Sequence, residues 1–120
     1  MAEHPWPEDI ALNATADLLT VRFDSGEVFA ISAELLRVES PSAEVQGHGS
    51  SQKQTPWGKR QVTITAIRPV GNYAVRLVFS DGHDSGLFTW ETLYRFGCDG
   101  DAMMQDYCNR LDALGRSRDA

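Results

Sequence analysis

The stretch YAVRLVFSDGHDSGLFTW, residues 73–90, carries most of what the sequence says about the fold. Its first seven residues alternate large apolar residues with others, so one face of a β-strand carries Tyr73, Val75, Leu77 and Phe79. The Asp-Gly pair that follows is typical of a tight turn between antiparallel strands. LFTW then has strand composition again. The stretch therefore predicts a β-hairpin with one apolar face.

Further strands are predicted on the N-terminal side of this hairpin. QVTITAI (61–67) is β-branched and alternating, and RPVGN turns the chain from it into the strand that begins at Tyr73. LLTVRF (18–23) and EVFAI (27–31) flank the residues DSG and predict a second hairpin. The two hairpins are not taken as a repeat, because Asp, Ser and Gly are common in any such turn.

Two short helices are predicted from capping residues. The Ser32 hydroxyl can accept a hydrogen bond from the free amides at the start of a helix over AELLRV (33–38). Thr89 can cap a helix over WETLYRF (90–96) in the same way, and Gly97 is expected to end it.

A third, amphipathic helix is predicted from Asp101 to Gly115. The residues that recur at helical spacing are Met103, Met104, Tyr107, Cys108, Leu111 and Leu114. The methionine pair is expected in the core rather than at a binding surface. The fold class is therefore α+β: a single domain over 1–120, with a small, mostly antiparallel sheet built from hairpins, short helices packed on one side and a C-terminal amphipathic helix.

Composition and charge exclude several classes of protein. The chain has 120 residues, 42% of them hydrophobic, with a formal net charge of -6 and a pI near 4.9. An acidic chain has no overall positive field to attract nucleic acid. Its longest apolar run is far shorter than the roughly 20 residues that span a membrane. The start, MAEHPWPEDI, lacks the basic and apolar regions of a secretory signal. A cytoplasmic protein without nucleic acid or membrane partners is expected.

No complete catalytic set is present in the sequence. GHGSSQKQ (47–54) resembles a nucleotide-binding P-loop, but Gln52 replaces a required glycine and Gln54 a required hydroxyl. None of the three histidines has the His-x-Asp or His-x-Glu spacing of a non-haem iron site. Ser, His and Asp occur without a nucleophile elbow or a similar context. An enzyme is therefore not expected, and neither is a bound cofactor.

A metal site is a weaker alternative. Imidazole and thiolate bind zinc or iron well, and the available donors are His48, His83, Cys98 and Cys108. Their spacing does not favour a site. His83 follows an Asp-Gly turn, where a surface histidine is the default expectation. The cysteines lie ten residues apart and are predicted to be reduced, partly buried thiols.

A local group of basic residues stands out in this acidic chain. It consists of Lys53, Lys59, Arg60 and Arg68. A solvated loop is the first interpretation of such a group, and an anion or partner site is the second.

A family resemblance spans most of the chain, about residues 8–97. LLRVESPSAEVQGHG (35–49), GKRQVTI (58–64) and RPVGNYAVRLVFSDGHDSGLFTWETLYRFG (68–97) resemble the family named for the N-terminal domain of gamma-butyrobetaine hydroxylase. Residues 98–115 then form a C-terminal helical extension. Members of the family occur as small stand-alone bacterial proteins, at the front of carnitine-pathway oxygenases and at the end of some P-loop ATPases with iron–sulfur clusters.

The resemblance also concerns a structural zinc site that relatives of this domain have. In the hydroxylases that this domain resembles, three cysteines after a Leu-Arg pair and one later histidine hold a structural zinc. The cysteine positions fall here on Ser40, Ser42 and Val45, and the histidine falls on His83. Hydroxyls are poor zinc ligands and valine is none, so the resemblance implies that the four-ligand site is lost.

The resulting hypothesis is a non-catalytic accessory or interaction module with a protein partner, associated with iron–sulfur or other metalloprotein assembly. One alternative is a zinc- or iron-binding protein that uses His83 with His48 or a cysteine. Another is a non-catalytic component of a 2-oxoglutarate oxygenase system. The candidate interaction surface consists of Arg37, Ser40, Ser42, His48, Lys53, Lys59, Arg60, Asp84 and Trp90.

Overall fold

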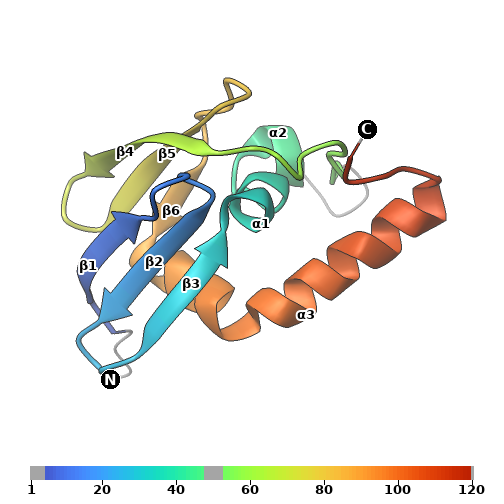
Figure 1. The fold of residues 1–120 in the computed structure, drawn as a ribbon. Helices are drawn as coiled ribbons and strands as arrows, with labels where there is room; N and C mark the ends of the chain where they lie inside the picture. The colour runs from blue at the N-terminus through green and yellow to red at the C-terminus, as the bar shows by residue number, and fades with distance from the viewer. Residues whose placement is uncertain (1–4, 48–52, 120) are drawn as a thin grey trace.

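Six strands form two three-stranded antiparallel sheets in the computed structural model, which describes residues 5–47 and 53–119 (Figure 1). The first sheet has the order β1 (Pro7–Leu12), β2 (Leu18–Phe23), β3 (Val28–Ser32). The second has the order β4 (Ile64–Val70), β5 (Ala74–Phe79), β6 (Leu87–Thr89). The predicted α+β class and both hairpins are confirmed, with the strands divided between two sheets.

Two of the helices, α1 (Ala33–Val38) and α3 (Trp90–Leu114), begin where the capping residues predict. A one-turn helix, α2 (Ala43–Gln46), lies between them in sequence. The Ser32 hydroxyl accepts a hydrogen bond of 3.0 Å from the amide of Leu35, and the Thr89 hydroxyl accepts one of 3.2 Å from the amide of Thr92. None of the helices in the described ranges is long and apolar enough to cross a membrane.

The helices predicted on either side of Gly97 form one helix of 25 residues. Gly97 lies inside α3 and does not end it. A Cβ at Gly97 would lie 2.3 Å from the ring Cγ of Phe29, so the missing side chain allows β3 to pack closely against the helix. The prediction that Gly97 ends a helix was wrong because this glycine provides close packing instead of a cap. Gly115, with a φ of 67°, is the residue that caps α3 at its end.

Two further elements and one boundary differ from what the sequence predicts. β1 was not predicted, since PEDIAL contains two acids and a proline, and its pairing with β2 is what makes it a strand. The polar loop after α1 contains the one-turn helix α2. β4 runs over Ile64–Val70 instead of 61–67, so the turn into β5 is shorter than RPVGN.

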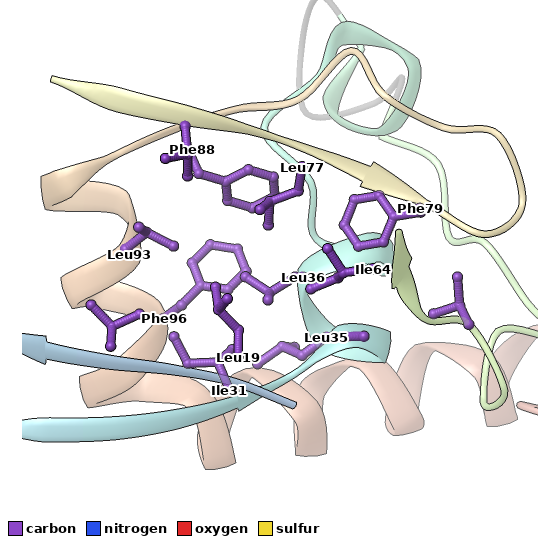
Figure 2. Packing of buried hydrophobic residues seen from close by; sticks show 14 of the residues in the cluster. Leu19, Ile31, Leu35, Leu36, Ile64, Leu77, Phe79, Phe88, Leu93 and Phe96 are labelled. Carbon is purple, nitrogen blue, oxygen red and sulfur yellow. The ribbon is translucent and has the colours of Figure 1, made fainter. Parts of the chain in front are cut away.

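The main core lies between the two sheets, α1 and the first part of α3 (Figure 2). Figure 2 shows how these elements converge, with Leu19 and Ile31 from the first sheet, Leu77, Phe79 and Phe88 from the second, Leu35 and Leu36 from α1, and Leu93 and Phe96 from α3. On β5 the predicted apolar face is buried. Tyr73, which precedes the strand, is 50% exposed.

The rest of α3 and the segment after it pack against α1. Val38, Tyr107 and Leu111 form a second buried cluster. The guanidinium group of Arg118 binds both carboxylate oxygens of Glu34, whose side chain is 5% exposed. Residues far apart in the chain are therefore joined at this end of the molecule, as the ribbon in Figure 1 also shows.

Candidate functional site

The turn between β5 and β6, residues 80–86, buries its histidine. The side chain of His83 is only 6% exposed and lies against the ring of Phe79, with 6.0 Å between ring centroids. The backbone of His83 is fixed too, since its carbonyl accepts from the Phe79 amide at 2.9 Å and its amide donates to Asp81 at 3.2 Å. The expectation of a surface histidine was wrong, because the turn folds its side chain inward.

His83 faces two buried serine hydroxyls. Its Nε2 atom lies 3.2 Å from Ser40 Oγ and 3.2 Å from Ser42 Oγ, and these serines are 0% and 4% exposed. Val45, one turn further along, is also buried. The structure therefore brings together three of the four residues to which the resemblance assigns a zinc site, His83, Ser40 and Ser42. Bond lengths to tetrahedral zinc would place sulfur and nitrogen ligands about 3.5 Å apart, close to these oxygen–nitrogen distances.

The side chains that are present do not fit a zinc ion. His83 offers one good donor, the serine hydroxyls are poor ligands at neutral pH, and Val45 has no donor. In the described part of the chain, no three His, Cys, Asp or Glu side chains are grouped so as to hold a metal. Cys108 is half-buried, as predicted, but Cys98 is exposed. His48 lies outside the described residues.

The charge state of His83 follows from its surroundings. Burial lowers the pKa of His83 below its usual value of 6.5, and the positive charge of Arg37 lowers it further, while nearby carboxylates oppose the shift. The imidazole is therefore neutral at pH 7, with one nitrogen that donates and one that accepts. Since a hydroxyl can donate or accept, Ser40 and Ser42 satisfy Nε2 in either tautomer.

Asp81 ties the same turn to two cations. Its Oδ2 atom accepts from Arg37 Nε at 2.8 Å and from Lys59 Nζ at 2.6 Å. Burial raises the pKa of Asp81, but the hydrogen bonds from Lys59, the His83 amide and Arg37 outweigh it and hold the pKa at about 2. The hydroxyl of Ser85 donates to Glu44 in a further close contact. The turn is thus joined at several points to the segment around α2.

The predicted basic group is separated by its ion pairs. Lys53 binds Glu39 at 2.8 Å, Lys59 binds Asp81, and Arg60 binds Asp119. Each of these loop cations is therefore used within the chain, and Arg68 lies apart from them on β4.

Two other predicted surface residues have different positions. Asp84 is exposed in the turn beside His83. Trp90 is half-buried and donates from its indole Nε1 to the Asn72 carbonyl at 2.8 Å. Since Asn72 precedes β5 and His83 follows it, Trp90 lies at the opposite end of that strand from the histidine.

Sequence reasoning missed Asp81 and Gly86. A Cβ at Gly86 would lie 2.2 Å from Ser40 Oγ, so this glycine lets the serine approach the turn. A signal was present, because Gly82 already supplies the glycine that a tight turn needs, and a second one in the same turn points to close packing. Asp81 offered no comparable signal, since aspartate is common at this position of any turn.

Comparisons with known proteins identify the family of the chain and its structural neighbours. The family model described as "Gamma-butyrobetaine hydroxylase-like, N-terminal" matches residues 10–94. Two proteins with solution NMR structures are 43% and 44% identical to the chain. Each alignment covers 98% of it and 92% or 88% of the other chain, with TM-scores of 0.84 and 0.83.

A crystal structure of a protein with unknown function from Acidithiobacillus ferrooxidans ATCC 23270, which belongs to the DUF971 family, is 36% identical. It covers 79% of this chain and 98% of its own, with a TM-score of 0.66. A search of curated proteins gave no match. Since the family model spans well over half of the residues, the chain belongs to the gamma-butyrobetaine hydroxylase-like N-terminal family.

Proposed function

We propose that the chain is a non-catalytic interaction module that acts by binding another protein. The observation that carries this proposal is the burial of His83 between Ser40 and Ser42. A general acid or base must reach a proton on its substrate. Here His83, the one histidine within residues 5–47 and 53–119, is 6% exposed, and its Nε2 atom is engaged by residues of the same chain. Its contacts favour a structural role.

The contacts of the turn 80–86 hold the segment that contains α2 in place. His83 contacts both serines, Asp81 binds Arg37, and Ser85 binds Glu44. The partners lie 41 to 44 residues apart in the sequence, so the contacts fix two distant segments relative to each other. In the hydroxylases that this domain resembles, zinc would hold the equivalent segments. Here hydrogen bonds and an ion pair take its place.

The resemblance also supports a partner class. Family members accompany oxygenases and ATPases with iron–sulfur clusters, so we propose iron–sulfur or other metalloprotein assembly factors as the first candidates. A role as a non-catalytic component of a 2-oxoglutarate oxygenase system is the competing assignment. A metal-binding role would need donors besides His83, which the described residues do not place beside it.

Affinity capture of the full chain from its own cells, quantified by mass spectrometry against a tag-only control, tests the proposal. Reproducible enrichment of a protein partner is expected, and its identity distinguishes assembly factors from an oxygenase. In parallel, the purified chain with iron(II) and 2-oxoglutarate should consume no 2-oxoglutarate above the free-iron background. Turnover that disappears in His83→Ala, or the lack of any enriched protein, would overturn the proposal.

A further inference from the structure

The lysine and arginine side chains all lie in the described ranges, 5–47 and 53–119, and there only Arg68 and Arg76 have no partner. The residues paired with carboxylates are Arg22, Arg37, Lys53, Lys59, Arg60, Arg110 and Arg118. Arg95 and Arg116 lie over aromatic rings. With a net charge of -6, the chain has an excess of carboxylates, so two cations without a partner are unexpected.

The two free arginines stand directly opposite each other. Arg68 on β4 pairs with Arg76 on β5 in the antiparallel register, and both are exposed. Directly opposite residues share a face and have Cβ atoms about 4.5–5.5 Å apart. Because Leu77, the next residue on β5, points into the core, both arginines project from the outer face of the sheet.

This arrangement does not stabilise the hairpin. Like charges at directly opposite positions repel each other, and no carboxylate in the described ranges relieves the repulsion between Arg68 and Arg76. An anion placed between the two guanidinium groups would relieve it, since each group can donate two parallel hydrogen bonds to a carboxylate.

The surroundings of the pair are apolar. The neighbours on the same face follow from the register: Ala66 pairs with Val78, Val70 pairs with Ala74, and Leu87 of β6 lies beside Arg76. Ala66, Val70, Val78 and Leu87 are all half-buried. Two positive charges thus stand on an aliphatic strip, and we name these six residues, Arg68 and Arg76 with the four half-buried ones, the arginine face.

We propose that the arginine face binds an acidic segment of a partner protein, with an Asp or Glu carboxylate bridging Arg68 and Arg76 and a neighbouring aliphatic side chain covering Val78 and Leu87. The proposal rests on the proposed function and gives that interaction module its surface and its class of ligand. Nucleic acid fits less well, because its binding rests on several phosphate contacts and the arginine face offers only two cations.

The test is an NMR titration of the ¹⁵N-labelled full chain, at low ionic strength, with an acetylated peptide of alternating Glu and Val residues. The controls are the corresponding Lys and Val peptide and inorganic phosphate. Amide shifts should be confined to residues 66–70, 74–78 and 87–89. The double variant Arg68→Gln/Arg76→Gln should bind about tenfold more weakly. Arg22→Gln, at an exposed cation of the other sheet that pairs with Glu8, should bind as the wild type does.

Several outcomes would overturn the proposal. They are a lack of shifts with the acidic peptide, shifts outside these strands, equal binding by the double variant, and shifts of the same size with phosphate alone. A dispersed amide spectrum of the double variant shows that it is folded, so a loss of binding cannot be attributed to unfolding.

Affinity capture with the same double variant separates this inference from the proposed function. A partner that wild type captures and the double variant loses supports both. If wild type and the double variant capture the same partner, the proposed function stands and the arginine face is refuted as its surface. If neither protein captures a partner, the proposed function is refuted.

Discussion

The turns at residues 24–26 and 80–86 use the same residue types and make contacts of different range. In the first, Asp24 accepts a hydrogen bond of 3.1 Å from the amide of Trp6, and Ser25 donates to Glu27 at 2.8 Å, both within or next to the same sheet. In the second, aspartate, histidine and serine contact residues 41 to 44 positions earlier, beyond the sheet. The residue types specify a turn in both places, and the neighbouring segments decide which residues the turn contacts.

The glycines explain why the two turns nevertheless look alike in sequence. Gly26 and Gly82 have φ angles of 94° and 92°, and a Cβ at either position would meet nothing within 4 Å. Each one serves only the backbone reversal. Gly86 has no equivalent in the first turn, and it is packed against Ser40. Asp81 and residues 83–86 therefore distinguish the second turn from the first, because they connect it to segments outside its own sheet.

The strongest test of this difference restores a metal to the second turn. Ser40→Cys/Ser42→Cys/Val45→Cys would place three thiolates beside His83, and we expect it to bind one zinc per chain. At a zinc concentration a thousand times its Kd, binding would add about 4 kcal/mol and raise the melting temperature by about 10 °C or more. Elemental analysis and thermal unfolding with and without a chelator measure both effects.

The matched control is the same triple variant with His83→Ala, which should bind zinc more weakly. The wild-type chain should show no change in melting temperature on chelation, because only one of its four positions carries a good ligand. A large drop in the melting temperature of wild type on chelation would contradict the interpretation that the second turn is held without metal. A triple variant that binds no zinc would contradict the interpretation that its geometry suits a zinc site.

Replacing a glycine by alanine should reduce the unfolding free energy more in the second turn than in the first, and this difference should be smaller than the effect of zinc. Gly86→Ala is expected to cost about 1–3 kcal/mol of unfolding free energy, because its Cβ would overlap Ser40 Oγ. Gly26→Ala should cost about 1 kcal/mol, from the positive φ alone. Urea denaturation gives both values. In a Ser40→Ala background the cost of Gly86→Ala should fall, and an unchanged cost would show that this contact is not its cause.

The smallest expected effect is a dependence of stability on pH that comes from the second turn alone. The folded chain lowers the pKa of His83, so below about pH 6.5 the unfolded chain takes up a proton that the folded chain does not. Stability present above that pH should therefore be lost as the pH falls toward the folded-state pKa, by at most about 1.4 kcal/mol per pH unit. Unfolding free energies measured at a series of pH values should show a flatter slope in His83→Gln. Parallel curves would exclude His83 as the source.

Local chemistry explains why part of this fold could be read from the sequence. The alternation in β5 and the hydroxyl caps Ser32 and Thr89 depend on neighbouring residues, and they were predicted correctly. β1 and the uninterrupted helix through Gly97 depend on segments that lie far away in the chain, so local pattern could not reveal them.

The same division applies to the candidate site. The family resemblance brought Ser40, Ser42, Val45 and His83 to attention. It did not show that the histidine is buried, because burial follows from how residues 80–86 pack on the segment around α2. The arginine face was missed for a related reason. Its two cations lie eight residues apart in the sequence, and only the strand register places them opposite each other.

The ion pair between Glu34 and Arg118 has a consequence for how the chain is made. The ribosome adds Arg118 84 residues after Glu34, so a nascent chain can complete α1 and most of α3 before the guanidinium group exists. Until then, Glu34 lacks the cation that pairs with it in the folded chain, so α1 docks without the stabilisation of this ion pair. The placement of a helix in the first half of the described residues is therefore completed by a residue that is synthesised 84 positions later.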